Sequence, residues 1–324
     1  MFNKEKFGLV LSGGGAKGAY QIGAWKALVD LGFSEQIGAI SGVSVGALNS
    51  VLISQRNHSL AEFIWTDLCE KCILKSKEIG VTDILSFIGT FSFVWPVKIV
   101  NSISRLIYGG IFSREGLRML IKEHINLSLI KNYDFQTIST CCKIPSFSAE
   151  RFCLNDCSDD RIIDVMCATS AVPLVFEPEI IDNSIYYDGG LTDNIPVKPL
   201  YDKGFKNILV LNISDSPLKK SQFPDANILE IRPKIELNGF LDFSKNMATK
   251  RIQQGYDEVY NHLKNYKFVQ LFREFAIDEI ERLLNKSIEL DKNLDAYSTS
   301  ANKDIEELDE LLIEYKKQQI EFLN

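Results

Sequence analysis

The chain has 324 residues and a formal net charge of -7 at neutral pH, from 36 Lys and Arg against 43 Asp and Glu. Its 45% hydrophobic and 24% charged residues are typical of a soluble globular protein with one large domain or two smaller ones. The acidic balance argues against a nucleic-acid-binding protein. The charge is uneven, because from Phe268 onward 14 Asp and Glu face 7 Lys and Arg, which leaves 29 of each before it.

The N-terminal residues and the cysteines predict a cytoplasmic protein. Residues 1–6 lead directly into a short apolar run and not into the hydrophobic core of a signal peptide. Without a secretory signal, the odd number of seven cysteines indicates reduced thiols. Cys69 and Cys72 form a C-x-x-C with no second pair, so no metal site is predicted. The nearest candidate for a membrane span, the uncharged run of residues 84–97, is too short to cross a bilayer.

Two strand–turn–helix units occupy the first fifty residues. The apolar run 7–11 is followed by a glycine-rich turn at 13–18 and then by a segment with apolar residues at helical spacing. The run 37–40 is followed by a second glycine-bearing turn at 42–46 and by the unbroken apolar segment 47–53. If the two strands are parallel, both helix N-termini point to one edge of the sheet. That edge collects backbone N–H groups, which suit an anion or a developing oxyanion.

The second turn, Gly42-Val43-Ser44-Val45-Gly46, has the G-x-S-x-G form of a nucleophile elbow. A serine in such an elbow lies on a strained turn with its hydroxyl exposed, and the flanking glycines Gly42 and Gly46 let the chain double back. The alternative is a turn in which Ser44 only caps the following helix.

The first turn matches G-x-G-x-x-G, which is also the pattern of a dinucleotide site. Such a site needs an acidic residue at the end of the second strand, and here that strand ends at Ser41-Gly42. A P-loop is excluded because the spacing is short and Gly18 follows the lysine. The loop is therefore predicted to offer N–H donors beside a serine. Its residues are Gly13, Gly14, Gly15, Ala16, Lys17 and Gly18.

Residues 80–112 form an apolar, nearly uncharged segment with many aromatic side chains. One interpretation is a helical lid whose apolar face contacts substrate or a lipid interface. The other is an ordinary helical insertion packed on the core. The aromatic residues that a lid would present to lipid include Phe91, Phe93 and Trp95.

Helices are predicted at 59–72, 114–123 and 161–170, and strands at 135–141 and 146–154. The apolar run 207–213 suits a central strand.

Asp188 follows a predicted strand and precedes two glycines, Gly189 and Gly190. Because Asp-Gly is a common turn signal, this aspartate is either a turn residue or a base.

A long helix is predicted over 243–264, and an acidic helical extension over 268–324. Its residues Ile305, Leu308, Leu312, Tyr315, Gln319 and Phe322 alternate three and four apart. This seam either packs back on the domain or pairs with another subunit in a homo-oligomer.

Four blocks in order resemble the patatin-like phospholipase family: residues 13–18, 42–46, 170–178 (Ser-Ala-Val-Pro with Phe176 and Pro178) and 188–196. The resemblance covers roughly residues 6–265, and the catalytic blocks show no departure from the family pattern. It implies a three-layer α/β fold with a mostly parallel sheet between helices, in a catalytic domain of residues 1–267.

The resemblance also implies ester hydrolysis through an acyl-enzyme, with Ser44 as nucleophile and Asp188 as base in a dyad. N–H groups of the first loop, at Gly14 and Gly15, would stabilise the oxyanion, and neither metal nor cofactor is needed. The expected substrate is a phospholipid membrane surface, which the protein meets peripherally. Family members include bacterial effectors that attack the cell's own membrane during phage infection. Whether a small molecule or a protein activates this chain is left open.

Two other interpretations remain. Ser44, Asp188 and His262 follow the chain order of an α/β-hydrolase triad, although His262 lies within a predicted helix. A non-catalytic lipid-binding scaffold on the same fold is the second. The dyad predicts that activity survives loss of His262 and not loss of Asp188.

Overall fold

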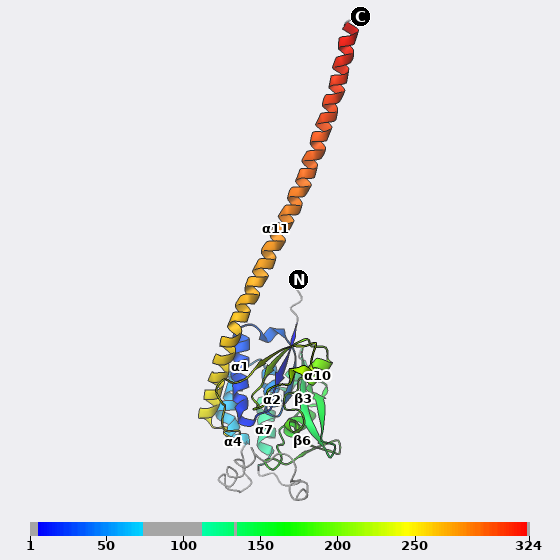
Figure 1. The fold of residues 1–324 in the computed structure, drawn as a ribbon. Helices are drawn as coiled ribbons and strands as arrows, with labels where there is room; N and C mark the ends of the chain where they lie inside the picture. Colours follow the sequence, from blue (N-terminus) through cyan, green and yellow to red (C-terminus); the bar gives the residue numbers. More distant parts are fainter. Residues whose placement is uncertain (1–5, 74–111, 133–134, 323–324) are drawn as a thin grey trace. The chain divides into compact units, whose positions relative to one another are not determined.

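The computed structural model describes residues 6–73, 112–132 and 135–322 (Figure 1). The chain divides into two compact units, Met1–Leu263 and Lys264–Asn324. The predicted lid, residues 80–112, lies outside the described residues except for Phe112. Phe91, Phe93 and Trp95 are therefore outside the described residues as well.

The described part of the first unit contains an eight-stranded sheet in the order β5-β6-β3-β2-β1-β7-β8, with β4 also paired to β3 (Figure 1). The neighbouring strands β3, β2, β1, β7 and β8 are parallel to one another. Strands β4, β6 and β5 are antiparallel to the strands they pair with. This confirms the predicted mostly parallel sheet. The strands are β1 (Phe7–Leu11), β2 (Ile37–Val43), β3 (Gln136–Ile144), β4 (Ser148–Cys153), β5 (Glu179–Ile181), β6 (Ser184–Asp188), β7 (Asn207–Leu211) and β8 (Asn227–Ile231).

Helices cover both faces of this sheet. Alternate residues of a strand point to opposite faces, so Leu9 and Leu11 enter a large core with residues of α1, α2, α7, α9 and α11. Val10 enters a smaller core with Val197 and with Leu200 of α10. The helices are α1 (Ala19–Asp30), α2 (Val45–Ser54), α3 (His58–Phe63), the π-helical turn Ile64–Leu68, α4 (Cys69–Ile73), α7 (Glu115–His124), α8 (Leu127–Lys131), α9 (Asp159–Thr169), α10 (Lys198–Asp202) and α11 (Lys245–Phe322).

Both predicted strand–turn–helix units are present at the same edge of the sheet. Leu11, the last residue of β1, pairs with Gly42 of β2, so the two turns begin side by side. The first turn passes through the 3-10 helix η1 (Gly15–Gly18) into α1, and the second passes through Ser44 into α2.

Helix α11 differs from the prediction of a helix that ends near residue 264. It runs without interruption from Lys245 to Phe322, through the change in composition at Phe268. The physical reason is that no glycine or proline follows Gly255 to break it.

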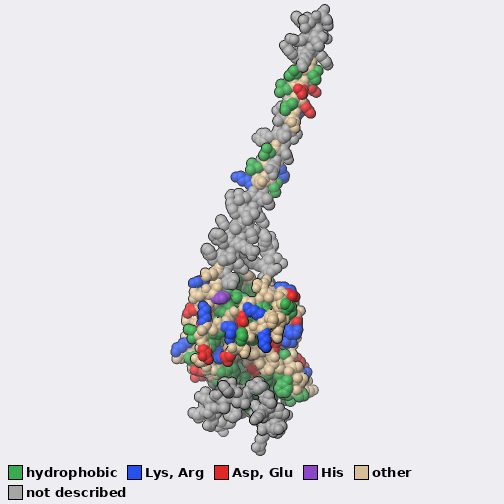
Figure 2. All heavy atoms as spheres, in the orientation of Figure 1, with side chains coloured by type: hydrophobic (Ala, Val, Ile, Leu, Met, Phe, Trp, Pro, Cys, Tyr) green, Lys and Arg blue, Asp and Glu red, His purple; other side chains and the backbone are tan. Residues whose placement is uncertain are grey.

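Charged side chains of both signs are interspersed over the face of the first unit that Figure 2 shows. In the second unit, exposed apolar side chains alternate with acidic ones; the former include Leu294, Ile305 and Leu308. Tyr315, Gln319 and Phe322 of the predicted seam have side chains outside the described set. Among the described residues, no helix combines the length and the hydropathy that a membrane span requires.

Candidate active site

Ser44 lies alone between β2 and α2, on a strained turn. Its φ of 54° and ψ of -130° place it in a left-handed region that residues with a side chain rarely adopt. The glycines beside it are required by close contact, because a Cβ on Gly46 would lie 2.2 Å from the carbonyl oxygen of Leu11. A Cβ on Gly42 would lie 2.6 Å from the carbonyl oxygen of Gly46. The Ser44 side chain does not cap α2, so the capping interpretation is wrong.

Thr169, the last residue of α9, holds the elbow in place through a hydrogen bond. The backbone N–H of Ser44 donates to Thr169 Oγ1 at 2.9 Å, and the Thr169 hydroxyl donates to the carbonyl of Thr140 at 2.6 Å. All three groups are buried. This chain of hydrogen bonds connects the nucleophile turn to β3.

Asp188 meets Ser44 because of the strand register across β3. Val43, the last residue of β2, pairs with Thr140, and the next residue of β3, Cys141, pairs with Asp188 at the end of antiparallel β6. Ser44 and Asp188 therefore lie at one level of the sheet, on either side of β3. They are only 6% and 5% exposed, and the serine hydroxyl lies close enough to the carboxylate to lower its pKa.

Burial raises the pKa of the Asp188 carboxyl from 3.8 to about 6. The hydroxyl of Ser44, the N–H of Gly190 and the charge of Arg114 act in the opposite direction. The Gly190 N–H donates to Asp188 Oδ1 at 2.7 Å, and the Asp188 N–H donates to the carbonyl of Ala171 at 2.9 Å. A carboxylate with this pKa is a stronger base than a free aspartate and is still mostly ionised at neutral pH.

The glycine-rich loop lies beside Ser44, and a Cβ on Gly13 would come within 3.3 Å of the serine Cβ. Within the described part of the chain, the N–H groups of Gly14 and Gly15 have no acceptor. Lys17 extends toward Asp215, with 3.1 Å between Nζ and the carboxylate. The remaining loop N–H groups with carbonyl partners are those of Gly13 (Asn194, 3.2 Å), Ala16 (Phe240, 2.8 Å) and Lys17 (Gly14, 3.2 Å).

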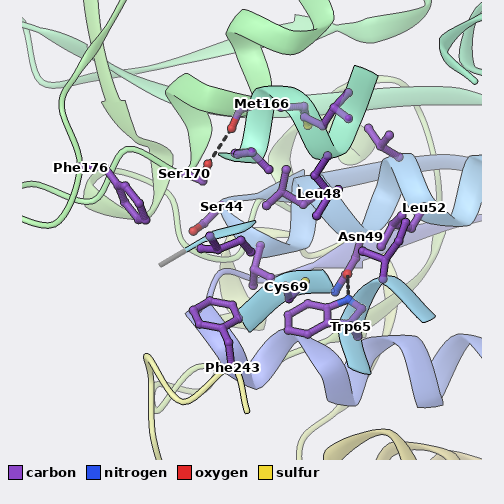
Figure 3. Close-up of a pocket in the computed structure, with 18 of the residues that line it drawn as sticks. Ser44, Leu48, Asn49, Leu52, Trp65, Cys69, Met166, Ser170, Phe176 and Phe243 are labelled. Carbon is purple, nitrogen blue, oxygen red and sulfur yellow. Dashed lines mark hydrogen bonds between the residues drawn. The ribbon is translucent and has the colours of Figure 1, made fainter. Parts of the chain in front are cut away.

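Ser44 lies where two pockets of opposite character meet. The first has a cavity volume of about 70 Å³ and is lined mainly by apolar side chains of α2, α7 and the segment 64–73. Figure 3 shows Ser44 toward one end of this pocket, with Leu48 and Leu52 of α2 along it and the rings of Phe176 and Phe243 in the same part of the view as the serine.

The second pocket, called the polar pocket below, has a larger polar share in its lining than the first and a cavity volume of about 740 Å³. Besides Ser44 and Asp188 it is lined by charged side chains of both signs. These are Lys17, Asp193, Asp215 and Lys219.

Sequence reasoning missed Arg114 and Thr169. Arg114 donates to the carbonyl of Cys167, and its guanidinium lies 4.1 Å from the centre of the Phe176 ring. Burial lowers the pKa of Arg114 to about 10. No motif surrounds Arg114, and Thr169 directly precedes the block 170–178 without belonging to it. Only the approach of α7 and α9 to the elbow reveals their roles. His262 is exposed on α11 and does not belong to the lining of either pocket.

Comparison with protein families gives one match. The sequence model described as Patatin-like phospholipase matches residues 9–201, which is more than half of the chain. The matched region begins in β1, ends in α10 and contains Ser44 and Asp188. No curated protein matches the chain.

Several solved structures are similar to the chain. VipD from Legionella pneumophila has 15% identity and a TM-score of 0.40, covering 81% of this chain and 67% of that chain. ExoU from Pseudomonas aeruginosa, in complex with SpcU, has 18% identity and a TM-score of 0.42, covering 81% and 52%. Human GIVD cytosolic phospholipase A2, in complex with methyl gamma-linolenyl fluorophosphonate, has 12% identity and a TM-score of 0.42, covering 84% and 59%. The chain thus spans between about half and two thirds of the length of these proteins.

Proposed function

The chain belongs to the patatin-like phospholipase family, and on this premise we propose that it is a serine hydrolase that cleaves acyl esters of membrane glycerophospholipids. Ser44 is the proposed nucleophile and Asp188 the proposed base. One observation carries the proposal: a serine on a strained turn lies at the same level of the sheet as a buried carboxylate whose pKa is about 6. Such a pair is the arrangement that nucleophilic catalysis requires.

The proposed reaction has two halves. Ser44 Oγ attacks the ester carbonyl carbon while Asp188 accepts the hydroxyl proton, and Asp188 then returns this proton to the leaving alcohol oxygen. Water attacks the resulting acyl-enzyme, Asp188 accepts a proton from it, and Ser44 leaves reprotonated with release of the fatty acid. In both tetrahedral intermediates the negative oxygen would accept from the N–H groups of Gly14 and Gly15, which have no other acceptor in the described part of the chain.

The two pockets support an acyl lipid with a polar head as the substrate class. An acyl chain suits the apolar pocket, and a charged head group suits the polar pocket with its lysines and aspartates. Because the apolar cavity is only about 70 Å³, its lining side chains must move apart for a chain to enter. We propose that the protein acts at the membrane surface, since both ends of the substrate then stay in their preferred surroundings.

The test is fatty-acid release from mixed phospholipid vesicles by the wild type and two substitutions, Ser44→Ala and Asp188→Asn. Both should lose activity by several orders of magnitude, because each removes a group that forms or breaks bonds. Ser146→Ala and Asp225→Asn are matched controls, since both residues are exposed and line neither pocket. They should keep most of the activity.

A fluorophosphonate probe separates a silent enzyme from a wrong assignment. The probe should label Ser44 in the wild type and in Asp225→Asn. Equal fatty-acid release by Ser44→Ala and the wild type would refute the proposal, and so would absence of both labelling and hydrolysis. Loss of activity in His262→Ala with activity kept in Asp188→Asn would favour the histidine triad.

A further inference from the structure

Arg251, on α11, is a buried charged residue that the reaction above does not use. It is 2% exposed and has the largest side chain among the fully buried residues of the described chain. Burial of a charge is unfavourable unless hydrogen bonds satisfy it. The two Nη atoms meet this condition with backbone carbonyls: Nη1 donates to Ala16 (3.0 Å) and Asp242 (2.7 Å), and Nη2 donates to Gly239 (2.9 Å) and Asn238. Nε is buried and has no partner among the described residues.

These carbonyls belong to two loops that lie beside the proposed nucleophile. Ala16 is part of the glycine-rich loop, and residues 238–242 contain Phe240, which lines both pockets. The loops also contact each other directly, since the Ala16 N–H donates to the Phe240 carbonyl at 2.8 Å. The contact is tight, because a Cβ on Gly15 would lie 2.4 Å from the same carbonyl oxygen. Arg251 therefore holds together the two loops that fix the direction of the Gly15 N–H.

Helix α11 gives Arg251 a fixed position relative to the glycine-rich loop. One turn after Arg251, α11 crosses α1 at a close glycine contact: a Cβ on Gly255 would lie 2.0 Å from the Tyr20 carbonyl oxygen. Next to this crossing, the Tyr20 hydroxyl donates to Glu258 at 3.0 Å. Because α1 continues directly from the loop, the arginine and the loop share one rigid support.

We propose that Arg251 is a positioning residue for the oxyanion hole, which aims the N–H groups of Gly14 and Gly15 at the reacting carbonyl. This inference rests on the proposed function. A guanidinium suits the task because its planar fork donates in fixed directions to several acceptors at once. Lysine keeps the charge but carries three donors on one nitrogen, so it cannot reach four carbonyls on two loops.

The test compares Arg251→Lys and Arg251→Met with Val259→Ala. Val259 is buried on the same helix, two turns further on, and its apolar side chain cannot donate a hydrogen bond to the glycine-rich loop. Its truncation controls for a general loss of stability, since both kinds of change weaken the packing of α11. Arg251→Met leaves four carbonyls unpaired and risks failing to fold. The result for Arg251→Lys therefore decides whether the proposal stands.

A displacement of about 1 Å at a reacting centre reduces the rate on the order of 10²-fold. We expect this loss in kcat for Arg251→Lys, with KM close to that of the wild type. The specific readout is the ratio of kcat/KM for an ester and for the thionoester with the same acyl and leaving groups. Sulfur is a weaker hydrogen-bond acceptor than oxygen, so misaimed donors slow the ester more than the thionoester. The ratio should fall in Arg251→Lys and stay unchanged in Val259→Ala.

Amide hydrogen exchange measures the same contact without any substrate. Residues 13–18 should exchange faster in Arg251→Lys than in the wild type and in Val259→Ala. An unchanged ester-to-thionoester ratio, or unchanged exchange at residues 13–18, would overturn the proposal. A wild type that neither hydrolyses esters nor is labelled by the fluorophosphonate probe would refute the proposed function, and the exchange measurement would still decide whether Arg251 holds the loop.

Discussion

Replacing Asp188 by asparagine should stabilise the protein at neutral pH although it removes activity. The substitution keeps the size of the side chain and the acceptor for the Gly190 N–H, which lies 2.7 Å from Oδ1. It removes the negative charge of a residue that is only 5% exposed. The wild-type carboxyl has a pKa of about 6 in the folded protein against 3.8 when it is solvated.

The size and the pH window follow from these two pKa values. Between about pH 3.8 and pH 6 the folded protein retains a proton that the unfolded chain releases. Protonation of Asp188 therefore favours the folded state at low pH, and the free energy of unfolding decreases as the pH rises through this window. The full difference is about 3 kcal/mol. The asparagine variant escapes this loss, so its advantage is largest at pH 7 and disappears near pH 4.

Urea unfolding followed by circular dichroism, at pH 7.0 and pH 4.5, measures this difference directly. We expect Asp188→Asn to exceed the wild type by up to about 3 kcal/mol at pH 7.0 and by much less at pH 4.5. Asp193→Asn, on a residue that pairs with Arg151 at 3.1 Å, should show no such gain. The reasoning is refuted if Asp188→Asn is less stable than the wild type at both pH values by the same amount.

Four further results are expected. The pH profile of kcat/KM should rise with an apparent pKa of about 6 and then level off, because only ionised Asp188 accepts the Ser44 proton; a flat profile from pH 4.5 to 8.5 would contradict this. Thr169→Val, which removes the acceptor for the Ser44 N–H, should lower activity and cost about 1–3 kcal/mol of stability, and Thr169→Ser should restore both in assays of hydrolysis and unfolding. Leu48→Trp should shift the preference toward shorter acyl chains in a series of esters, because it narrows the apolar pocket; an unchanged preference would place the acyl chain elsewhere. A chain that ends at residue 267 should keep the vesicle activity, since Ser44, Asp188 and both pockets belong to the unit Met1–Leu263.

The strands and the elbow could be predicted because their signals are local. A buried strand, a turn and a helix leave an apolar run, two glycines and a second apolar run within about fifteen residues. The order of the blocks around Ser44 and Asp188 indicated the family, and the family match over residues 9–201 agrees with it. The true length of α11 was missed because a change of composition was interpreted as an end, although no glycine or proline follows Gly255.

The positions of Thr169, Arg114 and Arg251 could not be predicted from the sequence. Thr169 is 125 residues from Ser44, and Arg251 is 235 residues from Ala16. A single hydrogen bond between such distant residues produces no periodic pattern and needs no neighbouring motif. Which residues come to lie beside the site depends on how the helices pack, and the packing of the helices depends on the whole core.

The amino-acid sequence by itself determined the strand–turn–helix units, the strained serine and the aspartate before two glycines, because each depends on backbone conformation within a few residues. Tertiary structure alone decided that β3 brings Ser44 and Asp188 to one level, that burial raises the pKa of the aspartate, and that Arg251 joins two loops. Register, desolvation and hydrogen bonds between distant elements are properties of the packed chain, so they exist only once the strands and helices have come together.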